Sequence, residues 1–157
     1  MSLAVCIEEA RWDDLPAIVG ILALETRFGV RDSADPADRP DYERAFAAIA
    51  EDPRTTLYVA RVGGRVLGTF QLTLMRALTR HGALLAIAEA VQVHPEARGQ
   101  GVGSAMMAFA IEEARRRGAA SLQLASNKQR LDAHRFYERA GFEKRLDGFK
   151  IDLLDKD

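Results

Sequence analysis

The segment from Arg98 to Ser104, RGQGVGS, has glycine at every second position. Glycine lets the backbone turn tightly and approach a ligand without a Cβ atom in the way, so the amide N–H groups of this turn can converge. An apolar pattern of helical spacing follows from Val102 to Ala114, which places the turn at a helix N-terminus. Free N–H groups and the positive end of a helix macrodipole favour an anion there, most naturally a phosphate.

Two common phosphate-binding patterns do not fit this turn. A P-loop requires G-x-x-x-x-G-K-[ST], and the first lysine of the whole chain is Lys128. A dinucleotide-binding turn requires G-x-G-x-x-G with an acidic residue about 20 positions later, whereas this turn reads G-x-G-x-G and residues 119–125 contain no acid. The pattern that fits is R-x-x-G-x-G, formed by Arg98, Gly101 and Gly103.

This pattern, after a strand that ends in Val91-Gln92-Val93, resembles the acetyl-CoA signature of the GNAT N-acetyltransferase superfamily. A second block, Asn127 followed by AHRFYERAGF at 133–142, resembles the other motif of that family. Two motifs in the right order, about 30 residues apart, are far more specific than either alone. The resemblance covers residues 84–142 closely and the rest of the chain only in layout.

The resemblance implies that acetyl-CoA is the cosubstrate and that the amides of the turn hold its pyrophosphate. It assigns the pantetheine arm to Asn127 and to the backbone of two parallel strands that splay apart. It also places Tyr137 near the thioester sulfur as a proton donor; the alternative is an aromatic side chain that packs against the strands. The cofactor-binding residues expected on this basis are Val91, Val93, Arg98, Gly99, Gln100, Gly101, Val102, Gly103, Ser104 and Asn127.

Glu89 is the expected general base. Alternate residues of a strand share a face, so Glu89 is expected beside Val91 and Val93 and opposite the alanines at 86, 88 and 90. A carboxylate on a mostly buried strand needs a partner, a water path or a role in the chemistry. In members of the family a glutamate on this strand often acts through water as a general base; the alternative is a structural carboxylate paired with an arginine. The backbone N–H of Val91 is the expected oxyanion donor.

The remaining patterns predict the elements that position these residues. Gly63-Gly64 marks a hairpin, and the helix between the central strand and the next one implies a parallel pair. With the resemblance, these patterns predict an α/β fold with a mixed, mostly antiparallel twisted sheet of 6–7 strands, a central parallel splayed pair and helices on both faces. The predicted strands are Leu3–Glu9, Thr55–Val62, Arg65–Met75, the strand that ends at Val93, Ser121–Ala125, Phe142–Leu146 and Phe149–Leu154.

Four local predictions concern single residues. Asp13 or Asp14 is expected to cap the first helix, and Gly141 the last one. Cys6 lies in the first predicted strand and is expected in the core, since no cation beside it in the sequence would activate a nucleophile. Gly68 marks a bulge or close packing.

Composition narrows the class of protein. The 157 residues, of which 48% are hydrophobic and 29% charged, suit one ordinary globular domain spanning 1–157. A net charge of −1 gives no general attraction to nucleic acid or to anionic membranes. No signal-peptide pattern opens the chain and no run approaches about 18 apolar residues, so we expect a cytoplasmic protein. The three histidines are scattered and the single cysteine cannot form an internal disulfide, so no metal site is expected.

The expected reaction is transfer of an acetyl group from acetyl-CoA to a primary amine by direct attack in a ternary complex. No acidic cluster marks a polycationic acceptor, so the acceptor stays open between a small molecule and a peptide. Members of the family often form homodimers, which makes a second copy the expected protein partner. The alternative from another class is a catalytically inactive acyl-CoA-binding sensor or interaction module, and a dinucleotide-dependent oxidoreductase is the third.

Overall fold

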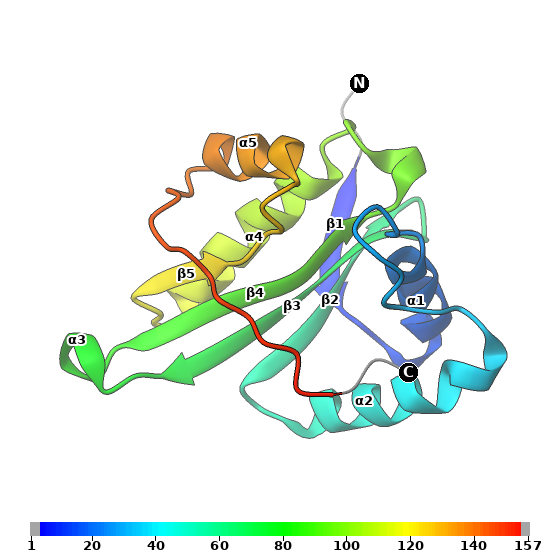
Figure 1. Ribbon diagram of the computed structural model, residues 1–157, viewed down its shortest axis with the longest axis horizontal. Helices are drawn as coiled ribbons and strands as arrows, with labels where there is room; N and C mark the ends of the chain where they lie inside the picture. The colour runs from blue at the N-terminus through cyan, green and yellow to red at the C-terminus, as the bar shows by residue number, and fades with distance from the viewer. Residues whose placement is uncertain (1–3, 155–157) are drawn as a thin grey trace. The chain divides into compact units, whose positions relative to one another are not determined.

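The computed structural model describes residues 4–154 and separates into two compact units, one that runs to Leu124 and one that begins at Ala125. The strands all lie in the first unit (Figure 1); they are β1 (Val5–Glu9), β2 (Thr55–Val62), β3 (Arg65–Arg76), β4 (Leu84–Val93) and β5 (Ser121–Leu124). The helices are η1 (Trp12–Asp14), α1 (Leu15–Ala23), η2 (Pro36–Asp38), α2 (Arg39–Glu51), α3 (Thr79–Gly82), η3 (Pro95–Ala97), α4 (Val102–Arg116) and, in the second unit, α5 (Leu131–Arg139). Within residues 4–154 no helix combines the length and the apolar character that a membrane span needs.

The sheet is open and mixed, with the strand order β1-β2-β3-β4-β5. Its neighbours pair antiparallel except β4 and β5, which are parallel and joined through α4. The predicted parallel pair is therefore confirmed, although it lies at one edge of the sheet rather than at its centre. The prediction of 6–7 strands is wrong, because the sheet has five.

The missing strands are the predicted hairpin formed by Phe142–Leu146 and Phe149–Leu154, where the described chain contains no strand. Large apolar side chains of this segment are exposed, from 72% for Leu146 to 96% for Phe149. An alternating pattern becomes a strand only where a neighbouring strand supplies partners for its N–H and C=O groups. No strand ladder pairs these residues in the part of the second unit that the structure describes.

The hairpin between β2 and β3 follows the sequence closely. Gly63 and Gly64 connect the two strands with φ values of +57° and +80°. A two-residue hairpin turn of this hand requires positive φ at both positions, which glycine adopts without steric cost. The hairpin prediction is confirmed.

The core lies between the sheet and α4. The rings of Tyr58 and Phe70 stack with centroids 5.0 Å apart, and Phe109 of α4 lies edge-on to Tyr58, also at 5.0 Å. Gly68 of β3 lets the helix approach, because a Cβ atom there would lie 2.7 Å from Sδ of Met106. The interpretation of Gly68 as a site of close packing is confirmed.

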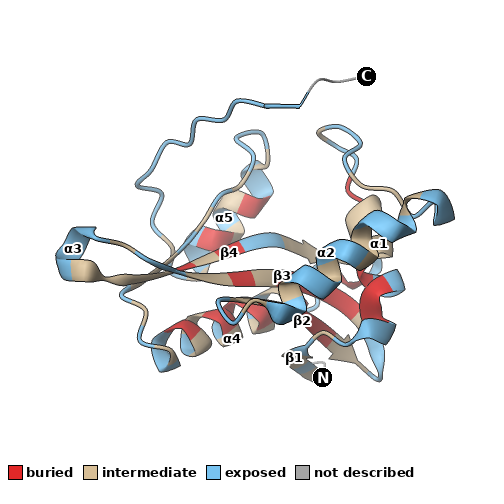
Figure 2. Cartoon of the chain, turned by 90° about the horizontal axis from the view of Figure 1, so that it is seen from below, coloured by how far each residue is buried: buried red, intermediate tan, exposed pale blue. Residues whose placement is uncertain are grey.

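Helices α1 and α2 lie on the opposite face of the sheet from α4 (Figure 1), so the prediction of helices on both faces is confirmed. Helix α1 buries Leu15, Ile18 and Ile21. Trp12 and Phe46 of α2 meet edge to face with centroids 5.6 Å apart. In Figure 2 the buried residues of the first unit gather on the strands and on the helix sides that face them.

Two predictions for single residues are corrected by the structure. Asp14 occupies the N-cap position of α1, as expected of Asp13 or Asp14, but within the described chain its side chain makes no cap hydrogen bond to that helix. Its Oδ2 atom instead accepts hydrogen bonds from the backbone N of Arg11 at 2.8 Å and from Nη2 of Arg61 at 2.5 Å, since a buried carboxylate gains most from a charged donor. Cys6 is exposed rather than in the core, because β1 is an edge strand of the sheet.

The last turn of α4 carries an ion-pair cluster on Glu113. Its carboxylate accepts from Nε of Arg116 at 3.1 Å and from Nε of Arg117 at 2.8 Å, and its side chain is 12% exposed. The hydrogen bond from Arg116, followed by that from Arg117, lowers the pKa of Glu113 from 4.5 to about 2. The arginines also complement the negative end of the helix dipole.

The Glu113 cluster predicts a dependence of stability on pH. A carboxyl group with a lowered folded-state pKa stabilises the fold above its unfolded pKa, and this contribution disappears as the pH falls from about 4.5 to about 2. The loss is at most about 3 kcal/mol, and less in high salt because Arg116 is mostly exposed. We expect urea unfolding of Glu113→Gln to show a smaller decline in unfolding free energy across this pH window than the wild type. The same substitution at Glu112, whose pair with Arg115 is exposed, is the control and should reproduce the wild-type decline; equal declines for Glu113→Gln and the wild type would contradict the prediction.

Candidate active site

The predicted glycine turn connects η3 to α4 just beyond the end of β4. Gly99 and Gly101 have φ values of +76° and +88°, the left-handed region that favours glycine, whereas Gly103 lies in the first turn of the helix. Gly101 is the N-cap of α4; its carbonyl accepts from the N–H of Ala105 at 3.0 Å, and no described side chain caps it. The N–H groups of the first helical turn have no acceptor within the helix, so they form an open cradle for an anion.

Side chains around the cradle have different environments. Nε2 of Gln100 donates to the carbonyl of Glu96 at 2.9 Å, so this side chain shapes the turn and leaves the backbone of Gln100 to face a ligand. Val102 is buried with 1% exposure and fixes the first residue of α4 against the sheet. Ser104 is exposed in the same helical turn. Val102 therefore holds the end of the turn against the sheet, whereas Ser104 is exposed to solvent.

Strand β4 extends beyond its ladder with β5. Their ladder runs from Leu85 with Ser121 to Ala88 with Leu124, while β4 continues to Val93. Within the described residues, 89–93 of β4 have no partner on β5. The ladder ends because β5 ends at Leu124, and the chain from Ala125 belongs to the second unit, so the expected splaying of the two strands stays a prediction.

A bulge in β4 changes which residues share a face. Glu89 pairs with Gln71 and Gln92 pairs with Thr69, so one residue of β3 lies opposite two residues of β4. Ala90, one of these two, has φ of +51°. Glu89 consequently shares its face with Gln92 rather than with Val93, and the expected alternation through Val91 and Val93 is wrong. Alanine rarely adopts positive φ, so the sequence contains no signal for this bulge.

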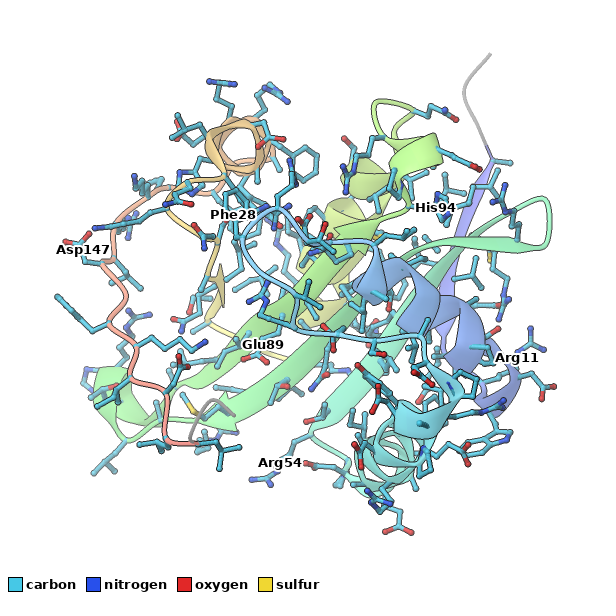
Figure 3. All side chains as sticks on the ribbon, turned by 45° about the vertical axis from the view of Figure 1, so that its right-hand side comes forward. Arg11, Phe28, Arg54, Glu89, His94 and Asp147 are labelled. Carbon is cyan, nitrogen blue, oxygen red and sulfur yellow. The ribbon has the colours of Figure 1, made fainter. Side chains whose placement is uncertain are left out.

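Glu89 lies on the sheet face opposite α4 and is exposed (Figure 3). Its register partner Gln71 points away from the face on which neighbouring Phe70 packs in the core. Ala86 and Ala88 are buried at 0% and 1% exposure on the other face. No arginine pairs with Glu89 among residues 4–154, so the alternative of a structural ion pair is not found.

The other two predicted site residues, Asn127 and Tyr137, belong to the second unit. Tyr137 on α5 is 8% exposed, and its ring lies edge-on to Phe136 at 5.3 Å and to Phe142 at 5.9 Å. Burial raises the pKa of Tyr137 above its usual 10.0, so the hydroxyl keeps its proton at neutral pH. The N–H of Gly141, with φ of +102°, donates to the carbonyl of Glu138 at 3.1 Å, which confirms the predicted cap.

Asn127 initiates the turn into α5. Its Oδ1 atom accepts from the N–H of Gln129 at 2.9 Å, and its carbonyl accepts from the N–H of Arg130 at 3.0 Å. Nε2 of His134 lies 2.8 Å from the same carbonyl. The structure thus groups Glu89, the β4 backbone and the cradle in one unit, and Asn127 with Tyr137 in the other.

Sequence reasoning missed a buried carboxylate next to the cradle. Glu25 follows the last turn of α1 and is 8% exposed. Its Oε2 atom lies 3.0 Å from Nη2 of Arg27 and 3.7 Å from Nη2 of Arg98, the arginine of the predicted motif. A glutamate after an apolar helix is typical of a surface residue, so no local pattern could reveal this burial.

The first unit thus combines an open mixed sheet, whose one described parallel pair is joined through α4, with a glycine turn at the N-terminus of that helix. Residues 15–142 match the acetyltransferase (GNAT) family, and the chain belongs to that family. The membership confirms the resemblance inferred from the two motifs. It makes the chain an acetyltransferase, and acetyl-CoA is the acetyl donor that the family uses.

Three proteins are described here as similar to this chain. The chain is 36% identical over 107 residues to an aminoalkylphosphonate N-acetyltransferase of Salmonella typhimurium, with 68% of this chain and 69% of that protein covered. It is 30% identical over 99 residues to a glucosamine 6-phosphate N-acetyltransferase of Trypanosoma brucei brucei, with 63% and 65% covered. A crystal structure described as a transcriptional regulator from Bacillus halodurans C-125 has a TM-score of 0.86 and 38% identity over 96% of this chain and 100% of its own.

The cradle predicts that Gly101→Ala weakens acetyl-CoA binding. A Cβ atom meets nothing within 4 Å there, so the cost comes from the φ of +88°, which a non-glycine residue adopts only with about 1–2 kcal/mol of strain. Relief of that strain would move the N–H groups of the turn, and we expect the Kd for acetyl-CoA, measured by calorimetry, to rise at least about tenfold. Gly20→Ala is the control, since Gly20 lies inside α1 with equally open space and an ordinary φ. Equal affinities of the two variants would contradict the role of the cradle.

Proposed function

We propose that this chain moves the acetyl group of acetyl-CoA to the primary amine of a small molecule by direct attack in a ternary complex. The observation that carries the proposal is the uncapped start of α4 after the glycine turn, next to the length of β4 that extends beyond its ladder with β5. The names of both curated relatives, which are N-acetyltransferases, also support a small amine as acceptor.

The residues around the cradle suit a CoA thioester. Arg98 and the amides of Gly99 to Ser104 match the charge of a pyrophosphate. The backbone at Val91 and Val93, which lacks a described β5 partner, offers polar groups to the amides of the pantetheine arm. From the resemblance of its motif, Asn127 of the second unit is a further proposed partner of that arm. Bound acetyl-CoA supplies the activated acetyl group, and the proton transfers fall to side chains of this chain.

Glu89 is the general base of this proposal. An amine with a lysine-like pKa near 10.4 is neutral in only about one molecule in a thousand at pH 7, so its deprotonation limits the attack. The exposed carboxylate of Glu89 stands directly before the bulge, where water can carry the proton to it. The N–H of Val91, within the bulge, is the proposed donor to the developing oxyanion, an interaction worth about 3 kcal/mol in other enzymes.

Tyr137 is the proposed acid that protonates the leaving thiolate. Its burial raises the pKa of the hydroxyl above 10.0, so the proton is present at neutral pH. A thiolate, whose thiol has a pKa of about 8.5, holds a proton less tightly than this phenolate does, so complete transfer from Tyr137 is uphill. The phenol therefore donates a hydrogen bond that stabilises the charge on the departing sulfur, and any proton that it transfers must return to Tyr137 from solvent before the next turnover.

For the acceptor we propose a small amine that also carries a phosphonate or phosphate group. The acceptors named for both curated relatives combine these two features. In this chain Arg31 is exposed on the loop that follows α1, and α1 lies on the sheet face opposite α4, as Glu89 does. An arginine fork matches a phosphorus oxyanion in two hydrogen bonds.

A second candidate function is a sensor that binds acyl-CoA without turnover. The observation that favours it is the 38% identical structure described as a transcriptional regulator. In that case the chain binds acetyl-CoA with an affinity similar to that expected of the enzyme, but it acetylates no amine.

From the sequence we also propose a cytoplasmic location, a homodimer, no resident metal and one functional domain over residues 1–157. Light scattering after gel filtration tests the dimer, and metal analysis of the purified protein tests the metal.

The acceptor proposal predicts a preference that a thiol-release assay can measure. Wild-type protein with saturating acetyl-CoA is given an aminoalkylphosphonate and glucosamine 6-phosphate. Matched amines without phosphorus, a simple alkylamine and glucosamine, serve as controls. We expect kcat/KM to be at least about a hundredfold higher for one of the phosphorus-containing amines, because a bidentate charged contact contributes roughly 3 kcal/mol. Acetyl-CoA binding without thiol release from any amine would favour the sensor instead.

Substitution of the two proposed catalytic residues should separate turnover from binding. We expect Glu89→Gln to lower kcat by about a hundredfold or more at pH 7 and to leave the Kd for acetyl-CoA unchanged. The loss should shrink above about pH 9, because the amine is then increasingly neutral without a base. Tyr137→Phe should also lower kcat at unchanged Kd. Glu112→Gln, at an exposed position of α4, is the control and should keep the wild-type kcat. Wild-type kcat in both Glu89→Gln and Tyr137→Phe would contradict the proposed roles of these two residues.

A further inference from the structure

We propose that Glu25 is a positioning residue that holds the side chain of Arg98 at the acetyl-CoA cradle. The inference rests on the proposed function, since it takes the turn from Arg98 to Ser104 as the site of the pyrophosphate.

The first observation is the burial of a charge. The Glu25 side chain is 7% exposed, and a carboxylate taken out of water requires cationic partners. Arg27 supplies two of its guanidinium nitrogens, Nε at 3.1 Å from Oε1 and Nη2 at 3.0 Å from Oε2, and its backbone N lies 3.2 Å from Oε1. Arg98 approaches the same Oε2 atom with Nη2 at 3.7 Å. One carboxylate thus contacts guanidinium groups from two distant segments.

The second observation is that Glu25 is the better anchored partner. Its backbone N donates to the carbonyl of Leu22 at 3.2 Å, so it continues the last turn of α1, and that helix is fixed by Ile18 and Ile21 in the core. Arg98 lies in a loop, and its side chain is 44% exposed. A long exposed side chain loses rotamer entropy when it binds an anion, and a fixed partner removes part of that cost beforehand.

Glu25 places a negative charge between two guanidinium groups. It lowers the repulsion between Arg27 and Arg98, and it also lowers the attraction of Arg98 for a phosphate. The two possible roles of Glu25 have opposite consequences. If it only supplies negative charge, its removal strengthens anion binding; if it positions Arg98, its removal weakens binding.

A double-mutant cycle distinguishes these roles. The Kd for acetyl-CoA is measured by calorimetry for the wild type, Glu25→Gln, Arg98→Gln and the double variant. We expect Glu25→Gln to raise the Kd about three- to tenfold, the range expected for the ordering of one flexible side chain, while kcat at saturating acetyl-CoA stays within about twofold. In the Arg98→Gln background, Glu25→Gln should have no further effect, because the side chain that it positions is gone.

Two further variants serve as controls for the cycle. Glu96 lies in η3, the helix before the same turn, and forms an exposed pair with Arg65. Glu96→Gln removes this carboxylate and should leave the Kd for acetyl-CoA unchanged. Glu25→Asp keeps the charge but shortens the side chain by one methylene, so it should also raise the Kd for acetyl-CoA. If Glu25→Gln does not fold, Glu25→Asp takes its place in the cycle. Unchanged or tighter binding by the folded Glu25 variants, or a loss that adds in full to that of Arg98→Gln, overturns the role of Glu25 alone. Absence of acetyl-CoA binding by the wild type overturns the proposed function and this inference with it.

Discussion

The close approach of α4 to strand β3 is the constraint on which the site depends. Gly68 leaves no Cβ atom between the strand and the helix, so Met106 and Val102 pack directly against the sheet. Val102 is also the first residue of α4, which means that the core holds the start of the helix at a defined height above the strands. The N–H groups at this helix end are therefore positioned by buried side chains of the first unit.

The partial charges of the helix dipole are compensated differently at the two ends of α4. At the C-terminal end, Arg115, Arg116 and Arg117 lie near the negative end of the dipole, and Glu113 fixes two of them. At the N-terminal end no described side chain caps the helix, and the compensating charge is left to a ligand. In a chain with a net charge of −1, this local arrangement rather than the overall charge favours an anion at the proposed cradle.

Strand β4 joins the anion site to the surface proposed for the chemistry. It is buried where it pairs with β5, at Ala86 and Ala88, and becomes exposed at Glu89, where that pairing has ended. The bulge that includes Ala90 reverses the faces beyond this point. The carboxylate of Glu89 and the backbone proposed to receive the thioester, at Val91 and Val93, lie within five residues of one strand. A regular strand with two complete ladders would have used these backbone groups within the sheet.

The sequence alone determined the features that depend on a few adjacent residues. The glycines of the turn before α4 and of the β2–β3 hairpin adopt the backbone that their type favours, and a helix between two strands implied their parallel pairing. The tertiary structure decided what depends on distant partners. Burial of Glu25 requires the turn at Arg98, the bulge at Ala90 requires the register with β3, and the alternating C-terminal segment stays without a strand because no described ladder pairs it. Backbone preference is local, whereas burial, ion pairing and strand pairing depend on residues that only folding brings together.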